Sequence, residues 1–205
     1  MCGIVGCFGL DADKNWVNNE ISNLKYRGPD SFGLVNPFSN LYFGSTRLAM
    51  TDPNPRSNLP FENSATGSVI SFNGEIYNYK ELRKKLIGEC FSTESDTEVL
   101  IKCLDNFKER TFNFIQGMYA FAYFDKINNK LILARDVLGK KPLYYTVRKN
   151  TIYWSSSINS LRNIYDEKKL SQEGLYQYLM LGYILDPVTS DNNIYSIKPG
   201  NRLII

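Results

Sequence analysis

The residue with the clearest chemical potential in this chain of 205 residues is Cys2, which directly follows the initiator Met1. Removal of Met1 would leave Cys2 with a thiol and a free α-amine on the same residue. The amine has a pKa of about 8 and the thiol one of about 8.5, so the amine can act as the base for its own side chain. Position alone favours a plain structural role for Cys2 as a small apolar residue, so the catalytic interpretation needs support from other residues.

The chain contains no histidine, and this restricts the chemistry that it can perform. Cys-His and Ser-His-Asp catalytic sets are excluded within the chain, and the commonest metal ligand is missing. The four cysteines, Cys2, Cys7, Cys90 and Cys103, form neither a CxxC pair nor a zinc pattern. We therefore predict no metal site, reduced thiols, and a base other than histidine for any catalysis.

Three polar residues and a glycine downstream of Cys2 could complete a site for an α-amino acid. Asn73 offers a side-chain amide and Gly74 a backbone N–H to an oxyanion. Arg47 could hold a carboxylate through two hydrogen bonds, and Asp96 could accept from an ammonium group. Each also has an ordinary explanation, as a hairpin turn, a surface arginine or a helix cap. Together they describe a pocket for a zwitterion beside a nucleophile.

Composition limits the classes of protein to which the chain could belong. The length suits one fairly large domain, and a 43% hydrophobic and 14% aromatic content provides a sizeable core. A net charge of +3, from 24 basic and 21 acidic residues, does not suggest a nucleic-acid partner. No apolar run approaches the roughly 18 residues of a membrane span, and the N-terminus lacks the basic region of a signal peptide. We therefore expect no membrane partner and a cytoplasmic location.

The pattern of apolar residues and turn signals predicts the elements that must position these side chains. Strands are predicted over 3–9, 41–48, 68–73, 118–125, 130–135, 142–147, 151–156 and 201–205. Helices are predicted over 15–25, 78–87, 95–107 and 171–181. Residues 26–33 are predicted to form a turn-rich loop, residues 51–60 an exposed irregular loop, and Asn73-Gly74 the turn that ends a strand. Strands and helices that occur in blocks favour an α+β fold with mainly antiparallel sheets.

A series of motifs resembles one known family along the whole chain. The chain resembles the class II glutamine amidotransferase domain, an N-terminal-nucleophile hydrolase, of the glutamine-hydrolysing asparagine synthetases. The motifs that carry the resemblance are "MCGIVG", "YRGPDSFG", "TRLAMTD", "FNGEIYNYKELR", "SDTEVLI", "GMYAFAYFD", "ARDVLGKKPLYY" and "IKPGNRL". The resemblance implies a four-layer αββα sandwich, with two antiparallel sheets between two layers of helices.

The resemblance also implies an activity, the hydrolysis of glutamine to glutamate and ammonia, and a role for each site residue. Cys2 corresponds to the nucleophile that forms a thioester, its α-amine to the base, and Asn73 and Gly74 to the oxyanion hole. Glutamine would be bound at its carboxylate by Arg47 and at its amine by Glu75 and Asp96. The pocket would also be lined by Leu48, Ala49, Met50 and Thr51.

In this family an ATP-dependent synthetase domain follows the glutaminase domain, and the resemblance therefore predicts one after residue 205. It would use ATP and magnesium to amidate aspartate to asparagine, with the ammonia supplied internally. The chain itself has no SGGxDS-like loop and no Walker A pattern, so no cofactor is expected within it. A homodimer is possible in such proteins. Two alternatives remain, a related synthetase with another acceptor, such as a sugar acid or a secondary metabolite, and a non-catalytic assembly domain.

The chain departs from the family pattern at a few positions. In the family, the segment that contains Ser157 and Asn159 lies toward the partner domain, so the changes there bear on the acceptor or on coupling more than on glutamine hydrolysis. The departing residues are Ser45, Val137, Leu138, Lys140, Ser157 and Asn159.

Overall fold

The computed structural model describes residues 1–205, and its strands form two antiparallel sheets. The six-stranded sheet has the order β10 (Tyr195–Ser196), β8 (Tyr144–Arg148), β9 (Thr151–Ser155), β1 (Gly3–Gly9), β3 (Leu41–Arg47) and β2 (Ser31–Phe38). The five-stranded sheet has the order β11 (Arg202–Ile204), β7 (Lys130–Arg135), β6 (Gly117–Asp125), β5 (Ser68–Ile76) and β4 (Phe61–Asn63).

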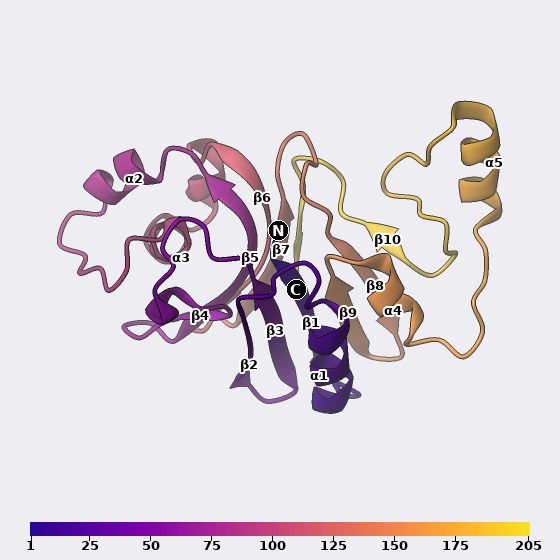
Figure 1. The fold of residues 1–205 in the computed structure, drawn as a ribbon, viewed down its shortest axis with the longest axis horizontal. Helices are drawn as coiled ribbons and strands as arrows, with labels where there is room; N and C mark the ends of the chain where they lie inside the picture. The colour runs from indigo at the N-terminus through magenta and orange to yellow at the C-terminus, as the bar shows by residue number, and fades with distance from the viewer.

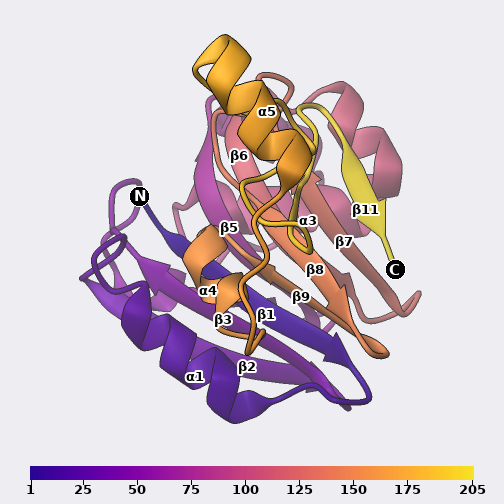
Figure 2. The same ribbon diagram turned by 90° about the vertical axis from the view of Figure 1, so that its right-hand side faces the viewer.

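Helices cover the outer face of each sheet (Figures 1 and 2). The six-stranded sheet is covered by α1 (Lys14–Asn23) and α4 (Ile158–Arg162), and the five-stranded sheet by α2 (Tyr79–Lys85) and α3 (Asp96–Phe107). Two short 3-10 helices, η1 (Pro55–Ser57) and η2 (Lys108–Asn113), lie in connections. A fifth α-helix, α5 (Gln172–Leu181), projects from the end of the molecule (Figure 1). The two sheets and their helices make four layers.

Three separate apolar cores lie between these four layers. Successive strand residues face opposite sides of a sheet, so one strand supplies two cores. On β5, Val69 packs between the sheets, whereas Ile70 and Phe72 pack under the helices. Phe43 and Trp154 meet edge to face between the sheets, with ring centroids 5.5 Å apart. The predicted α+β four-layer sandwich is confirmed.

The prediction of a turn at Asn73-Gly74 is wrong, because β5 runs through both residues to Ile76. Strand β6 offers a partner at every position, pairing Asn73 with Ala120 and continuing to Ile76 opposite Gly117. The glycine is required by the closeness of the two strands. A Cβ at Gly74 would lie 2.2 Å from the Met118 carbonyl oxygen.

Two predicted loops are also more ordered than the sequence indicates. The loop predicted over 26–33 ends at Asp30, because β2 begins at Ser31 and pairs there with Arg47. The segment predicted as an exposed loop over 51–60 contains η1, and Asp52, Ser57 and Leu59 within it are buried. This second loop lies next to the site described below.

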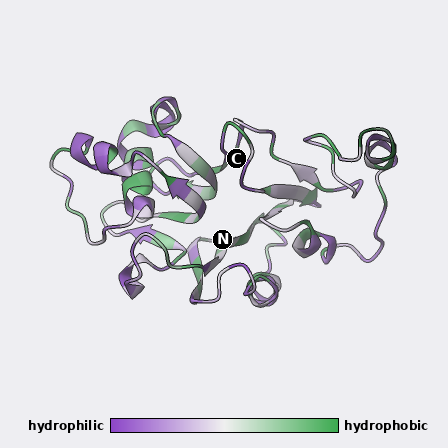
Figure 3. Cartoon of the chain, turned by 45° about the horizontal axis from the view of Figure 1, so that its top comes forward, coloured by the Kyte–Doolittle hydropathy of each residue, from purple (hydrophilic) through white to green (hydrophobic).

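Helix α5 has well-formed ends but little packing against the rest of the chain. Ser171 caps its first turn through a hydrogen bond to the Gly174 N–H, and Gly182 ends it in the left-handed conformation. Its apolar side chains are between 43% and 73% exposed, and Figure 3 shows hydrophobic residues on this projecting helix. They are Leu175, Tyr176, Tyr178, Leu179, Met180 and Leu181. None of the helices combines the length and the apolar character that crossing a membrane requires.

Candidate active site

Cys2 is held at the start of β1, a central strand of the six-stranded sheet. The Gly3 N–H donates to Thr46 Oγ1 at 3.0 Å, and Arg27 Nε donates to the Cys2 carbonyl oxygen at 3.3 Å. The Cys2 thiol lies 4.0 Å from the Leu48 carbonyl oxygen. Burial raises the pKa of the thiol, and the Leu48 contact, the N-terminal amine and Arg47 oppose this shift. The two backbone hydrogen bonds fix the peptide group that joins Cys2 to Gly3.

A cavity beside Cys2 brings together nearly all the residues predicted for the site. It opens between the ends of β1, β3 and β5, so both sheets contribute to it. Ala49 does not line the cavity, and its N–H donates to Asp30 Oδ2 at 2.8 Å. The predicted residues that do line it are Cys2, Arg47, Leu48, Met50, Thr51, Asn73, Gly74, Glu75 and Asp96.

Two N–H donors on β5 lack protein acceptors or strand partners. The Asn73 side chain is 1% exposed, and its Nδ2 makes no hydrogen bond. Tyr119, opposite Gly74, uses its own N–H and carbonyl oxygen with Asp136, on the side of β6 away from β5. The Gly74–Tyr119 pair therefore exchanges no hydrogen bond, and the Gly74 N–H points away from β6. It points to the same side as the Ile76 N–H, which meets Asp96.

Arg47, at the end of β3, is 6% exposed and is held by its own loop. Its Nη1 donates to the Asn54 carbonyl oxygen at 3.3 Å and to Asn58 Oδ1 at 3.1 Å, and its Nη2 donates to the Asp52 carbonyl oxygen. Three of its five N–H groups are thereby used. The Nε–H and one Nη2–H have no acceptor in the protein, so two donors remain for a carboxylate in the cavity.

Asp96 is the first residue of α3, where Ser95 caps the helix through the Glu98 N–H. Asp96 Oδ2 accepts from the Ile76 N–H at 2.9 Å, which leaves Oδ1 without a side-chain or strand partner. Burial raises the pKa of this carboxyl group to about 6, with a smaller contribution from the charge of Glu75. A ligand ammonium group would relieve both effects.

Comparison with known proteins identifies the family. The model of a family described as "Glutamine amidotransferase domain" matches residues 1–205. The chain belongs to this family. This confirms the resemblance that the motifs indicate.

Relatives of this amidotransferase domain are asparagine synthetases that are much longer than it. The chain is 36% identical to asparagine synthetase [glutamine-hydrolyzing] 1 of Bacillus subtilis (strain 168), covering all of the chain and 33% of that protein. It is 30% identical to a putative asparagine synthetase [glutamine-hydrolyzing] 2 of Methanocaldococcus jannaschii, of which it covers 44%. The domain thus spans between a third and a half of the length of these two relatives.

The fold of this amidotransferase domain also occurs in a solved structure of low sequence identity. That structure is the glutamine phosphoribosylpyrophosphate amidotransferase from B. subtilis, with a TM-score of 0.71 at 19% identity. The match covers the whole of this domain and 47% of the other chain. The two proteins therefore share the fold of this domain.

Some residues around the cavity carry no signal that sequence reasoning could use. Arg27 and Lys141 lie in the motifs "YRGPD" and "GKKPLYY", which indicate the family but no role for either residue. Arg27 holds the Cys2 backbone. Lys141 lines the cavity and is only 8% exposed, yet its ammonium group makes no ion pair. Further lining residues are Met1, Leu59, Phe72, Ser95, Thr97 and Met118.

Three of the departures from the family pattern lie away from the cavity of this amidotransferase domain. Ser45 is buried between the sheets, where its Oγ donates to Ser71 Oγ at 2.9 Å. Ser157 immediately precedes α4 and Asn159 lies on α4, on the outer face of the six-stranded sheet. None of the three lines the cavity beside Cys2.

Proposed function

We propose that this domain hydrolyses glutamine to glutamate and ammonia, with Cys2 as the nucleophile. The observation that carries the proposal is the Asn73 side chain, whose buried Nδ2 has no partner and lines the same cavity as Cys2. An unpaired buried donor costs free energy, so a binding role explains its presence better than a structural one. An oxyanion that forms during the reaction would be its acceptor.

The first half of the reaction forms a thioester. After removal of Met1, the α-amine of Cys2 takes the thiol proton, and the thiolate attacks the carboxamide carbon of glutamine. A carbon–sulfur bond forms, and the negative charge moves to the carbonyl oxygen, where Asn73 Nδ2 and the Gly74 N–H stabilise it. The carbon–nitrogen bond then breaks, and the amide nitrogen leaves as ammonia with the proton from the α-ammonium group.

The second half of the reaction releases the product. The α-amine takes a proton from a water molecule, and the oxygen attacks the thioester carbon through a second oxyanion. The carbon–sulfur bond breaks, the thiolate regains its proton and glutamate leaves. The same base and the same two donors serve both halves, so no histidine is needed.

The charges of the cavity match the two charged groups of glutamine. Arg47 offers two free N–H groups to the α-carboxylate, and the carboxylates of Asp96 and Glu75 face the α-ammonium group. Leu48, Met50 and Thr51 line the pocket between them. Binding at both charged ends orients the carboxamide toward Cys2.

The ammonia is consumed by an ATP-dependent amidation of aspartate to asparagine, in a second domain that holds ATP and magnesium. Support comes from relatives named asparagine synthetase, most of whose length lies outside the matched region. Helix α5 is the surface on which that domain packs, because a helix that is apolar on several faces requires a covering surface. An apolar depression beside α5, lined by Leu170, Leu175, Tyr178 and Ile184, would receive a side chain of that domain.

The proposal is tested by replacing the nucleophile and the oxyanion donor in processed protein. We expect C2A to have no glutaminase activity and N73A to lose about 10²–10³-fold in kcat, with little change in KM. C90S is the matched control, because Cys90 is an exposed thiol remote from the cavity. Intact mass measured beside activity checks the base, since protein that retains Met1 should be inactive.

Three results would contradict this proposal. They are glutamine hydrolysis by C2A, full activity of protein that retains Met1, and a normal kcat for N73A. The acceptor is tested separately, by supplying the full-length protein with glutamine, ATP, magnesium and aspartate. Asparagine is the expected product. Glutamine- and ATP-dependent amidation of another carboxylic acid in place of aspartate would instead assign the related synthetase class.

A further inference from the structure

Asp52 contacts both halves of the substrate site, although it does not line the cavity. Its backbone carbonyl oxygen accepts from Arg47 Nη2. Its side-chain Oδ2 accepts from the Glu94 N–H at 2.9 Å. Arg47 belongs to the carboxylate end of the site, and Glu94 lies two residues before Asp96 at the ammonium end.

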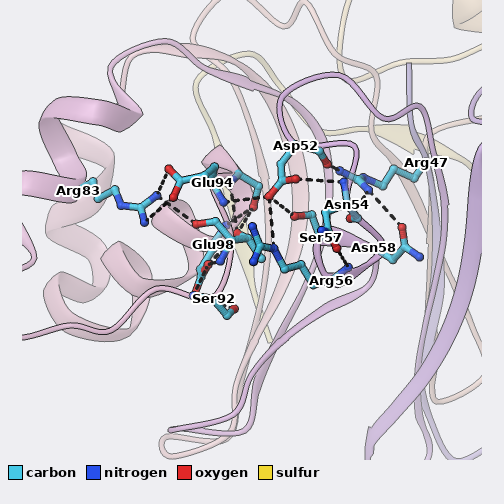
Figure 4. A network of polar contacts seen from close by, with 12 residues as sticks. Arg47, Asp52, Asn54, Arg56, Ser57, Asn58, Arg83, Ser92, Glu94 and Glu98 are labelled. Atoms are coloured by element: carbon cyan, nitrogen blue, oxygen red, sulfur yellow. Dashed lines mark hydrogen bonds and ion pairs between the residues drawn. The ribbon is translucent and has the colours of Figure 1, made fainter.

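The Asp52 carboxylate is buried and well supplied with donors. Oδ1 accepts from the Asn54 N–H at 3.0 Å, and Oδ2 also accepts from Ser57 Oγ at 2.9 Å. Arg56 Nε lies 3.9 Å from Oδ2. The N–H groups of Glu94 and Asn54 hold the pKa of this carboxyl group below its usual range. The group is thus an ionised acceptor fixed within its own loop, as Figure 4 shows.

The segment 92–98, which contains Glu94, is held by its own hydrogen bonds. The Glu98 carboxylate accepts from the Ser92 N–H at 2.9 Å and from the Thr93 N–H at 2.6 Å. Thr93 Oγ1 and Ser95 Oγ lie 2.9 Å apart, and Ser95 caps α3. A displacement of Glu94 would therefore carry the start of α3, including Asp96, with it.

One hydrogen bond joins the two segments directly. Between the loop 48–58 and the segment 90–95, the bond from the Glu94 N–H to Asp52 is the only hydrogen bond in the structure. The loop 48–58 connects β3 to β4, whereas the segment 90–95 connects α2 to α3, and the two are 42 residues apart in sequence at this contact. Without this bond, no hydrogen bond would join the two segments directly. The remaining polar link between Arg47 and Asp96 would run through β3, β5 and the Ile76 N–H.

We infer that Asp52 is a positioning residue that sets the distance between the carboxylate-binding and ammonium-binding ends of the site. The inference rests on the proposed function, because it assigns those two ends to glutamine. Asp52 does not touch the substrate. It makes the site selective for ligands that carry both an α-carboxylate and an α-ammonium group at the spacing of an amino acid.

The test uses D52N, which keeps the size of the side chain. If the amide oxygen introduced by D52N still accepts from the Glu94 N–H, the NH₂ group faces the Asn54 N–H and the hydrogen bond to Asn54 is lost. In the opposite orientation, the hydrogen bond from the Glu94 N–H is lost instead. The matched control is D105N. Asp105 also accepts three hydrogen bonds, from Asn63, Thr66 and Tyr123, and also joins a turn to α3, but lies away from the cavity.

Binding of glutamine is measured by calorimetry in the C2A background, so that catalysis does not enter the readout. We expect D52N to raise the Kd of glutamine about tenfold or more, because it weakens the hydrogen bond that holds the two ends of the site at the spacing of glutamine. Glutaramate lacks the α-amine and 4-aminobutanamide lacks the carboxylate. Each engages one end only, so we expect its Kd to change by less than about threefold.

Thermal unfolding of both variants separates positioning from a loss of stability. D105N should lower Tm, but the ratio of the Kd of glutamine to the Kd of each analogue should stay unchanged. S57A, which removes one anchor of the Asp52 carboxylate and leaves its charge, should weaken glutamine binding in the same direction by a smaller factor.

Equal changes for all three ligands in D52N, or the same ligand pattern in D105N, would overturn the inference. If glutamine binding depends on Asp52 as expected but the wild-type protein does not hydrolyse glutamine, only the proposed chemistry is contradicted.

Discussion

Two buried aspartates near the cavity have pKa values displaced in opposite directions. Asp52 receives two backbone N–H bonds, and its pKa is lowered. Asp96 receives one backbone N–H from β5 and faces Glu75, and its pKa is raised to about 6. Asp52 therefore stabilises the folded state when it is ionised, whereas ionised Asp96 destabilises it. A ligand ammonium group at Asp96 would recover this cost, which is the arrangement expected of a binding residue.

We predict that D96N is more stable than the wild type at neutral pH and binds glutamine more weakly. The pKa of Asp96 is raised in the folded state, so its stabilising contribution is present at low pH and is lost as pH rises toward 6. The neutral amide avoids that loss. We expect D96N to gain about 1–3 kcal/mol in unfolding free energy at pH 7.5 and to gain nothing near pH 4. Urea unfolding at both pH values checks this.

D52N provides the control of opposite sign. The lowered pKa of Asp52 gives stability that is present at neutral pH and is lost as pH falls through the folded-state value. D52N should therefore be less stable than the wild type at pH 7.5, with a difference that shrinks below pH 4. A D96N protein that is less stable than the wild type at pH 7.5 would show that Asp96 has a structural role instead.

Residue types and their spacing were enough to predict most of the polar residues that line the cavity, but not the residues that hold them in place. Cys2, Arg47, Asn73 and Asp96 could be selected because each carries a group that glutamine chemistry requires. Asp52 could not, because its effect depends on a backbone carbonyl and a carboxylate that act on different segments. Its loop contains three prolines, so the sequence predicts an exposed loop and gives no sign of these two contacts.

At the scale of elements, β5 and β6 fix the position of the two proposed oxyanion donors. The side chain of Asn73 and the N–H of Gly74 keep their directions because β6 pairs with β5 on both sides of them. The Asn-Gly dipeptide predicts a turn from local preference alone. Local preference takes no account of β6, which lies more than 40 residues away in sequence and pairs with β5 as far as Ile76.

We predict that G74A both destabilises the protein and slows turnover. The added methyl group would lie 2.2 Å from the Met118 carbonyl oxygen and 2.7 Å from the Tyr119 Cα, so the two strands must separate. Overpacking of this kind costs about 1–3 kcal/mol, and the shift would also move the Gly74 N–H. Thermal unfolding and kcat are the measurements.

G88A is the matched control for this variant. Gly88 has open space around it but a φ of +85°, so alanine there costs about 1 kcal/mol of backbone strain and leaves kcat unchanged. A G74A protein with wild-type Tm and kcat would show that the two strands can separate freely at this point.

At the scale of the whole molecule, the four layers leave one element without a partner. The cores between the layers account for helices α1 to α4, whereas the apolar side chains of α5 remain largely exposed. The sequence predicts the helix from its periodicity, but only the fold shows that it projects away from both sheets. Its composition suits an interface better than a free surface.

We predict that L179D in the full-length protein uncouples the two proposed activities, glutamine hydrolysis and asparagine synthesis. A carboxylate buried at the α5 surface would weaken packing of the proposed synthetase domain, so glutamine-dependent synthesis of asparagine should fall at least about tenfold. Glutamine hydrolysis and synthesis from added ammonia should remain close to the wild type, because α5 lies away from the cavity. Product yield per glutamine hydrolysed measures the coupling.

I87D is the control for this prediction, since Ile87 is a highly exposed apolar residue that follows α2 on the opposite side of the molecule. It should leave coupling intact, because no packing of a second domain is proposed there. Coupling that survives L179D would exclude α5 as the docking surface. A dimer of the 205-residue chain that L179D dissociates would assign the surface to a second copy instead, because the hydrophobic area of α5 can be covered only once.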